Sequence, residues 1–414
     1  MMNRRELLRL AGGAAAVMPM AGSRRTRQQR PLPKSEFDYV DWSWARWREI
    51  TSRARPSLKT PQSGHAELLA LLNPASAPVP PPWEERKRAI GSTLAACLGD
   101  APPARAPLEA ETLGQADEES HVRRHVRFRA GTGEWIPGYL LVPRRQDGRS
   151  APAPAVLCPH QTTQEGKREP AGLAGNPEQA TALHLVERGF VTLTWDALCF
   201  GERHDPATGH YGDAIPFYAA HPRWSLLGKM IADLSRAVDY LTTLEMVDPL
   251  RIGCAGHSHG GITTIFGLAL EPRLAAGASN CGFDTFRLDG NVWRWSHATA
   301  LMPMLGFHVS SPYITMDRYR GVPDSEVIQV PFDLHEVLAL VPPRPFWLST
   351  SDDDFVFPNA GWSARLAAAR LRPVYAAHGA LERLQSTFFS AGHRLPAQVA
   401  QPMYDWLERT LKPA

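Results

Sequence analysis

The residues with the clearest potential for chemistry form the pentapeptide GHSHG at residues 256–260. It is a G-x-S-x-G motif, and it lies between the apolar stretches RIGCA and GITTIFGLAL. When an apolar strand passes into a helix through such a turn, the serine hydroxyl is raised above the edge of a sheet, and larger residues in place of the glycines would collide with the strand and the helix. The motif and its setting therefore predict that Ser258 is a nucleophile.

A serine hydroxyl is a weak nucleophile until a base accepts its proton, and with this kind of turn the acid and the histidine follow the serine in that order. His393 comes after the strand pattern LERLQSTFF, and Asp352, Asp353 and Asp354 come after the strand pattern RPFWLSTS. A loop histidine is often only a surface residue, and an aspartate after a strand often caps a helix. Because all three elements stand in the required order at strand ends, we predict a triad in which His393 moves the proton and a carboxylate orients the imidazole. The residues alone leave the choice among the three aspartates open.

The two histidines beside the serine have other expected roles. The turn directs the side chains of His257 and His259 away from Ser258, so we expect neither to be the base. The backbone N–H of His259, directly after the nucleophile, is expected to donate a hydrogen bond to the oxyanion that forms in acyl transfer. No acidic residue beside the H-x-H pair completes a metal site. We therefore expect no metal and no cofactor.

The elements that must position these residues alternate regularly. From about residue 121 onward, short apolar strand patterns are followed by patterns with apolar residues at helical spacing. Strands are expected at residues 125–130, 135–143, 153–160, 190–197, 251–256, 274–281, 344–351 and 381–389, and helices near residues 38–50 and at 83–98, 181–190, 229–245, 260–270, 361–371 and 395–412. This alternation predicts an α/β fold with a mostly parallel, doubly wound sheet. Residues 283–340 interrupt it and are expected to form an inserted cap.

The residues before this domain have a different character. Residues 3–9, NRRELLR, are charged, and residues 10–22 form an apolar run rich in alanine and glycine. This order predicts an export signal over residues 1–22, and the paired arginines are typical of the twin-arginine type. The run is too short for a membrane span of about 20 residues, so we expect a periplasmic or secreted protein. Residues 23–120 are expected to be a partly helical extension before the α/β domain at residues 121–414.

Composition excludes several classes of protein. The chain has 414 residues, of which 43% are hydrophobic, and a formal net charge of +3. This size allows one large core or two moderate ones, and this charge creates no strong field for nucleic acid or anionic lipid. The five cysteines contain no CxxC pair, which disfavours a zinc site. We expect no nucleic-acid partner and no stable membrane insertion, and the sequence indicates no particular oligomeric state.

From about residue 121 onward the chain resembles the α/β-hydrolase superfamily, in particular the branch of dienelactone hydrolases and bacterial acetyl xylan or cephalosporin esterases. The stretches that carry the resemblance are PGYLLVP, LCPHQTTQEGK, WDALCFGER, VDPLRIGCAGHSHGG, HEVLALVPPRPF, DFVFPNAG and AGH. In that branch the acid stands four residues before a proline, so with Pro358 the resemblance implies Asp354. Relatives of the prolyl-oligopeptidase type place the acid one residue earlier, which would be Asp353.

The resemblance also implies a second oxyanion donor in the loop at residues 159–162. Within this loop it assigns the donor to the backbone N–H of Gln161. The side chains of His160 and Gln161 are alternatively expected to line the substrate pocket.

Two further positions have alternative interpretations. Arg203 follows the strand expected at residues 190–197, where it is expected either to contact a substrate carboxylate or to form an internal salt bridge. Trp295, with Trp224 and Trp293, flanks the site. These rings are expected either to stack on sugar rings or to fill the core of the cap.

Together these features predict an exported serine esterase that cleaves carboxylic esters through an acyl-enzyme. The resemblance and the export signal favour acyl esters of plant-type polysaccharide, or related small-molecule esters, as substrates. The glucuronoyl esterase pattern, with a basic residue after the serine, is absent because that residue is His259. One alternative is a serine peptidase of the prolyl-oligopeptidase type, for which residues 23–120 are too short to form the usual gating domain. Another is a catalytically silent binding hydrolase, against which the intact serine, acid and histidine argue.

Overall fold

The computed structural model describes residues 44–52, 83–99, 106–144, 151–209, 211–284, 302, 332–357 and 360–412. All of them belong to the unit that spans Phe37–Ala414. The predicted export signal, Trp293, Trp295 and most of the predicted cap lie outside the described residues. Of the cap, the structure describes Phe283, Asp284, Met302 and residues 332–340.

Within the described residues, nine strands form one sheet in the order β1-β2-β3-β5-β4-β6-β7-β8-β9. The strands are β1 (Glu111–Asp117), β2 (His121–Arg129), β3 (Trp135–Pro143), β4 (Ala153–Leu157), β5 (Val191–Trp195), β6 (Val247–His257), β7 (Leu274–Asn280), β8 (Phe346–Ser351) and β9 (Leu384–Phe389). The pairs from β1 to β5 are antiparallel, and every pair from β5 to β9 is parallel. The predicted mostly parallel sheet is confirmed.

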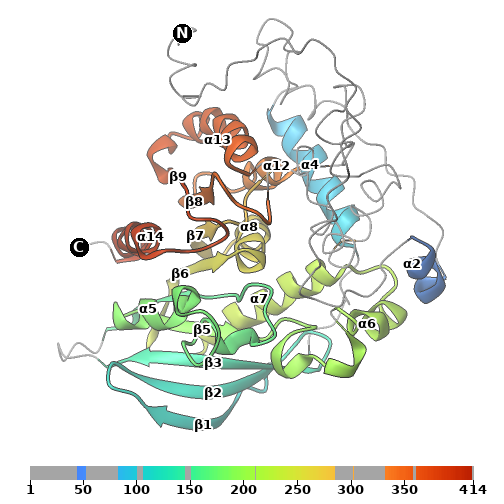
Figure 1. Cartoon of the computed structure of the whole chain (residues 1–414), viewed down its shortest axis with the longest axis vertical. Coiled ribbons are helices and arrows are strands. Elements are labelled where there is room, and N and C mark those ends of the chain that lie inside the picture. Colours follow the sequence, from blue (N-terminus) through green and yellow to red (C-terminus); the bar gives the residue numbers. More distant parts are fainter. Residues whose placement is uncertain are drawn as a thin grey trace, which may run out of the picture. The chain divides into compact units, whose positions relative to one another are not determined.

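Helices cover both faces of this sheet (Figure 1). They are α2 (Trp44–Thr51), α4 (Trp83–Leu98), α5 (Thr181–Glu187), α6 (Ala214–Ala220), α7 (Leu226–Thr242), α8 (His259–Leu270), α12 (Leu334–Leu338), α13 (Ala360–Ala377) and α14 (Ala397–Leu411). Helices α5 and α14 pack on one face, and α4, α7, α8, α12 and α13 pack in the core on the other.

Alternate residues of each central strand enter opposite cores because successive side chains of a strand point to opposite faces. In β8, Phe346 and Leu348 join the core on the α7 and α8 side, whereas Trp347 joins the core under α14. A strand that is buried on both faces is apolar throughout. This explains why the apolar runs predicted the central strands.

The edge strand β1 was not predicted, and it lies before the domain boundary that we expected at residue 121. Its sequence, ETLGQAD, is polar and almost wholly exposed, so it lacks the alternating apolar pattern of a half-buried strand. Its backbone pairs with β2 in an antiparallel ladder. Exposed ion pairs add to this ladder: Arg127 bonds to Glu111 at 2.8 Å and Arg144 bonds to Asp117 at 2.7 Å. The sheet therefore begins at Glu111.

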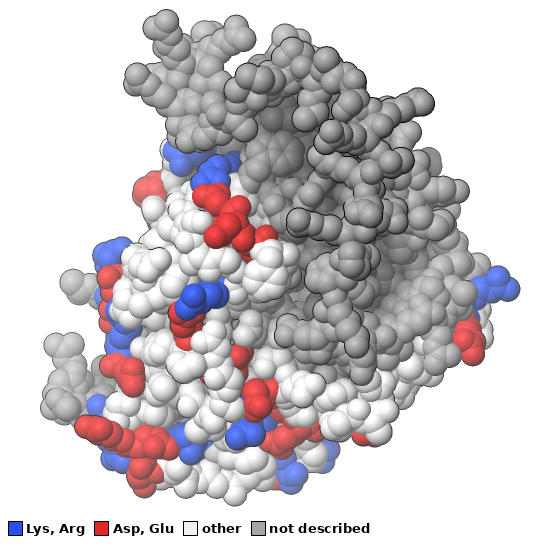
Figure 2. Space-filling view, viewed as in Figure 1, with Lys and Arg blue, Asp and Glu red and all other residues white. Residues whose placement is uncertain are grey.

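Charged side chains of both signs are interspersed over the described part of the face in Figure 2. Neither sign forms a separate patch there, in keeping with the small net charge. No helix within the described residues combines the length and the hydropathy that crossing a bilayer requires.

Candidate active site

Ser258 occupies a strained turn between β6 and α8. Its backbone has φ 54° and ψ −120°, a region that residues other than glycine rarely adopt and that is typical of a nucleophile turn. The two motif glycines are required by close backbone contacts. A Cβ on Gly256 would lie 2.5 Å from Gly260, and a Cβ on Gly260 would lie 2.2 Å from the carbonyl oxygen of Pro159. The motif therefore has the tight packing that sequence reasoning assigned to it.

His393 lies between the other two predicted residues. Its Nε2 is 2.8 Å from Ser258 Oγ, and its Nδ1 is 2.7 Å from Asp354 Oδ2. A carboxylate only accepts hydrogen bonds, so Nδ1 carries the proton and Nε2 is free to accept the serine proton. The parallel neighbours β8 and β9 deliver Asp354 and His393 to the same edge of the sheet as β6 delivers Ser258.

The structure distinguishes the two aspartates that the resemblance left in competition. Asp354 is buried, and besides His393 its carboxylate accepts the N–H groups of Val356 and Phe357 at 2.8 and 3.0 Å. Asp353 points elsewhere. Its Oδ1 accepts Gly392 N at 2.9 Å and Ser351 Oγ at 2.7 Å, and these bonds, the one from Gly392 first, lower the pKa of Asp353 to about 2. Asp353 thus braces the loop that carries His393 without contacting the imidazole.

Asp352, the third aspartate, bonds to α13. Its carboxylate accepts a hydrogen bond from Arg365 Nη2 of α13 at 2.9 Å, and both side chains are partly exposed. It therefore anchors the start of α13.

Asn280, at the end of β7, connects three segments of the site. Its carbonyl oxygen accepts the N–H of Ser258 at 2.8 Å. Its side-chain Nδ2 donates to the carbonyl of Arg394 at 2.9 Å, and its Oδ1 accepts from Ser349 Oγ at 2.7 Å. Sequence reasoning missed this residue, because an asparagine at the end of a strand carries no signal until the neighbouring loops are in place.

Two buried rings and a buried thiol lie near the imidazole of His393. The His257 ring lies 4.7 Å away between centroids and the Phe357 ring 5.2 Å away. Burial, and then the proximity of His393, lowers the pKa of His257 well below its ordinary value, so this ring is neutral. Cys281 Sγ also lies within 4.8 Å of ligand atoms of Asp354 and His393. Burial, followed by the charge of Asp354, raises the pKa of this thiol well above its ordinary value. A neutral thiol is a poor metal ligand.

The loop after β4 lies beside the Ser258 turn because β4 and β6 are parallel neighbours. In this loop His160 is buried; its Nδ1 lies 2.6 Å from the carbonyl oxygen of Gln161, and its Nε2 accepts the N–H of Ala197 at 3.2 Å. The Gln161 side chain donates to Glu169 at 2.9 Å. These bonds fix the backbone of the segment that carries the predicted oxyanion donor.

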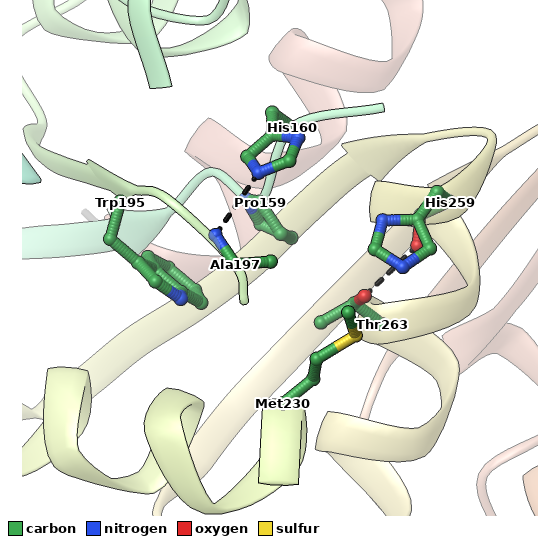
Figure 3. A pocket seen from close by; sticks show the side chains of 7 residues that line it. All are labelled: Pro159, His160, Trp195, Ala197, Met230, His259 and Thr263. Carbon is green, nitrogen blue, oxygen red and sulfur yellow. Dashed lines mark hydrogen bonds between the residues drawn. The ribbon is translucent and has the colours of Figure 1, made fainter. Parts of the chain in front are cut away.

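A small cavity lies between this loop and the first turn of α8 (Figure 3). It is lined by Pro159, His160, Trp195, Ala197, Met230, His259 and Thr263. Its volume is about 10 Å³, which is space for about one water molecule. His160 lines this cavity, whereas Gln161 is not among the lining residues.

Of the two roles expected for Arg203, the structure shows the internal salt bridge. Its side chain is 6% exposed, and its Nη1 donates to Asp233 of α7 at 2.8 Å and to the carbonyl of Asp196 at 3.1 Å. Burial alone would lower the pKa of Arg203, but the charges of Asp233, Glu134 and Asp196 together outweigh burial and raise it. Trp224 is likewise buried, with its ring 5.6 Å from that of Phe217.

No family model matches the chain. It is 25% identical over 321 residues to the "Putative hydrolase YtaP" of Bacillus subtilis, with 76% of this chain and 96% of that protein covered. A glucuronoyl esterase from Solibacter usitatus superposes with a TM-score of 0.58 at 17% identity, covering 78% of this chain and 91% of that one. A structure described as a putative acetyl xylan esterase from Bacteroides fragilis has a TM-score of 0.51 at 17% identity, covering 74% of each chain.

These likenesses agree with the sheet order, the helices on both faces and the strained turn after β6. The chain is thereby identified as a protein of the α/β-hydrolase fold.

Proposed function

We propose that the protein is a serine hydrolase that cleaves carboxylic esters through an acyl-enzyme. The observation that carries this proposal is the position of His393, whose two ring nitrogens lie within hydrogen-bonding distance of Ser258 and Asp354. The likeness to hydrolases and carbohydrate esterases supports it.

In the proposed reaction, Ser258 Oγ attacks the ester carbonyl while His393 Nε2 takes the hydroxyl proton. The tetrahedral intermediate then collapses, the bond to the alcohol oxygen breaks, and His393 gives its proton to that oxygen. Water, deprotonated by the same imidazole, attacks the acyl-enzyme and releases the acid. Asp354 keeps Nδ1 protonated and stabilises the imidazolium that forms in each half-reaction.

The backbone N–H groups of His259 and Gln161 are the proposed donors to the oxyanion. The His259 N–H is the first of α8, and the first N–H groups of a helix point out along its axis rather than to an acceptor within the helix. Gln161 lies in the loop after β4, beside β6, and its side chain is bound to Glu169. Donors that are fixed before the reaction cost no reorganisation when charge develops on the oxygen.

The proposed substrates are short-chain acyl esters of carbohydrate or another small alcohol. The likeness to acetyl xylan and glucuronoyl esterases favours a carbohydrate. His259 stands where the glucuronoyl esterase pattern has a basic residue, which favours acetyl over glucuronoyl esters. The predicted twin-arginine signal would place the enzyme outside the cytoplasm, and the resemblance to acetyl xylan esterases, together with export, is the basis for proposing esters of plant polysaccharide as substrates.

The test is the Ser258→Ala variant. Without the hydroxyl no acyl-enzyme forms, so we expect kcat for p-nitrophenyl acetate to fall by about 10³–10⁶-fold. Ser120→Ala, directly before β2, is the matched control and should retain full activity. Mass spectrometry of acid-quenched enzyme should find an acetyl group on the peptide that contains Ser258. Near-normal turnover by a correctly folded Ser258→Ala variant would refute the mechanism.

A further inference from the structure

Phe355 is an exposed aromatic ring directly after the candidate acid. It is 74% exposed, and it is the one aromatic among the large hydrophobic side chains that are exposed within the described residues; the others are Leu113, Leu250 and Leu270. An exposed phenylalanine leaves a large apolar surface in water, which is unfavourable unless a partner covers it. A single exposed apolar residue is common in proteins, so its surroundings decide whether it has a role.

The backbone around Phe355 is fixed. The preceding residue, Asp354, is buried, and its carboxylate accepts the N–H groups of Val356 and Phe357. Phe357 is 4% exposed and packs against His393. With anchored residues on both sides, Phe355 has little freedom to fold its ring back into the core.

The ring of Phe355 is also a neighbour of the proposed base. Its centroid lies 6.1 Å from that of the His393 imidazole, with the two planes at 75°. His257 and Phe357 are the buried rings around the same imidazole. Phe355 therefore stands where His393 meets the solvent.

The order of the strands indicates on which side of Ser258 each half of a bound ester lies. In the sheet, β4 with its oxyanion loop lies on one side of β6, and β8 and β9 lie on the other. The carbonyl oxygen of a bound ester points toward the oxyanion donors, whereas the alcohol oxygen must come within about 3 Å of His393 Nε2 to receive its proton. The alcohol half of the substrate therefore lies on the side of β8 and β9, next to Phe355.

We propose that Phe355 forms the binding surface for the alcohol half of the ester, and that this surface selects alcohols with a ring. A pyranose presents a face of C–H groups and an arene presents a flat π face, and either can cover the phenyl ring and exclude water from it. This inference rests on the proposed ester hydrolysis, and it adds the class of the leaving group to it.

The test compares three acetates that share an acyl group and differ in the alcohol: p-nitrophenyl acetate, an acetylated xylobiose and ethyl acetate. In Phe355→Ala we expect kcat/KM for the two ring-bearing esters to fall by about 5–30-fold, a loss typical of one stacked ring. For ethyl acetate the change should stay within about twofold. Phe355→Trp, which keeps a flat ring, should restore the ring-bearing substrates.

A kinetic separation excludes an indirect effect through His393. All three acetates give the same acetyl-enzyme, so the deacylation rate, followed in single turnovers, should be unchanged in Phe355→Ala. Leu250→Ala is the matched control, because Leu250 is 82% exposed near the start of β6, at the opposite end of that strand from Ser258. It should alter none of the rates.

Each outcome has a defined meaning. Losses confined to p-nitrophenyl acetate or to acetylated xylobiose would support the subsite and identify an arene or a sugar as its occupant. An equal loss for all three acetates, a slower deacylation, or no loss at all would overturn it. Failure of the proposed function is distinguishable, because then the native protein would hydrolyse none of the acetates and Ser258 would not be acetylated.

Discussion

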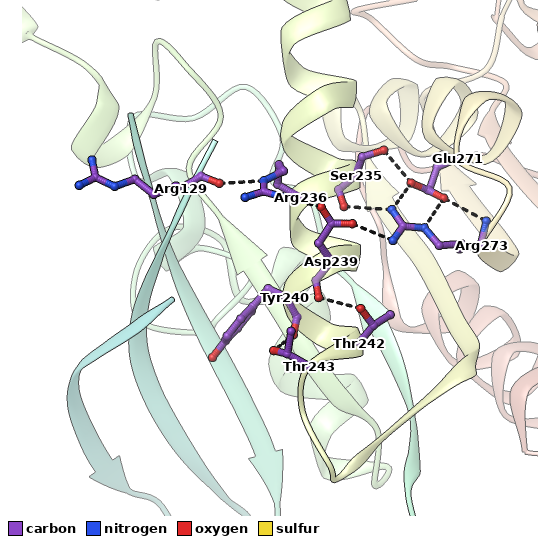
Figure 4. Close-up of polar contacts among 9 residues, drawn as sticks. All are labelled: Arg129, Ser235, Arg236, Asp239, Tyr240, Thr242, Thr243, Glu271 and Arg273. Carbon is purple, nitrogen blue, oxygen red and sulfur yellow. Dashed lines mark hydrogen bonds and ion pairs between the residues drawn. The ribbon is translucent and has the colours of Figure 1, made fainter. Parts of the chain in front are cut away.

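Strand β7 has a polar network at each end, and the two networks are built differently. Before its first residue, Arg273 donates to Glu271 Oε1 at 2.8 Å, to Glu271 Oε2 at 2.7 Å and to Asp239 of α7 at 2.7 Å (Figure 4). At the other end its last residue, Asn280, bonds to the Ser258 turn and to the His393 loop. The same strand therefore links a charged network to a catalytic candidate.

The difference lies in charge and in strain. At the Arg273 end a full positive charge meets two carboxylates, and Ser235 Oγ adds a further bond to Glu271 at 2.6 Å. At the site His257 and Cys281 are held neutral by burial, and Ser258 has a strained backbone. Saturated ion pairs fix elements in place. A hydroxyl bonded to an imidazole, in contrast, leaves a proton that can move.

The largest expected effect tests the assignment of the acid at the site. In Asp354→Asn the amide can donate to His393 Nδ1, which favours the tautomer with its proton on Nε2, so we expect kcat for p-nitrophenyl acetate to fall by about 10⁴-fold. Asp353→Asn changes bonds to Gly392, Ser351 and Ser390 and none to the imidazole, and a loss of less than about tenfold is expected. Steady-state kinetics of the two purified variants provide the comparison. A larger loss at 353 would transfer the role of acid to that residue.

The strands and the three consecutive aspartates show what the sequence could and could not predict. Apolar runs predicted the central strands because those strands are buried on both faces, whereas β1 was missed because it is polar and lies at an edge. The three consecutive aspartates could not be ranked from their types. Only the resemblance favoured Asp354, since the direction of each side chain depends on how the loop after β8 turns.

Contacts between distant segments account for the other misses. Arg203 is paired with Asp233, a residue of α7 whose position relative to the loop after β5 becomes known only once both elements pack on the sheet. Asn280 bonds to residues far away in the chain for the same reason. Sequence patterns report local periodicity, and these bonds are not local.

The charged end of β7 should affect stability rather than catalysis. Glu271 is 3% exposed and accepts bonds from Arg273 and Ser235, so Glu271→Gln places an amide N–H₂ against donors. We expect a loss of about 1–3 kcal/mol in the free energy of unfolding, seen by calorimetry as a fall in Tm of about 1–4 °C for a chain of this size. kcat should stay within about twofold of the native value.

The matched control is Glu111→Gln, the same chemical change in the exposed ion pair with Arg127 of β2. Exposed pairs contribute about 0–1 kcal/mol, so its Tm should hardly change. If Glu271→Gln lowered kcat by much more than twofold, the two ends of β7 would be coupled. The contrast between a structural and a catalytic network would then have to be abandoned.

The smallest expected effect is the pH dependence of the stability of Glu271→Gln. Burial alone would raise the pKa of Glu271, but the hydrogen bonds from Arg273 and Ser235 outweigh it and hold the pKa below its ordinary value of 4.5. The charged carboxylate therefore stabilises the fold fully above that ordinary value, and this contribution is lost as the pH falls through the lower pKa of the folded state. The gap in Tm between the native protein and Glu271→Gln should accordingly be constant near pH 7 and narrow below about pH 4. A gap that stays constant or widens in acid would mean that the stabilisation comes from packing around the side chain and not from its charge.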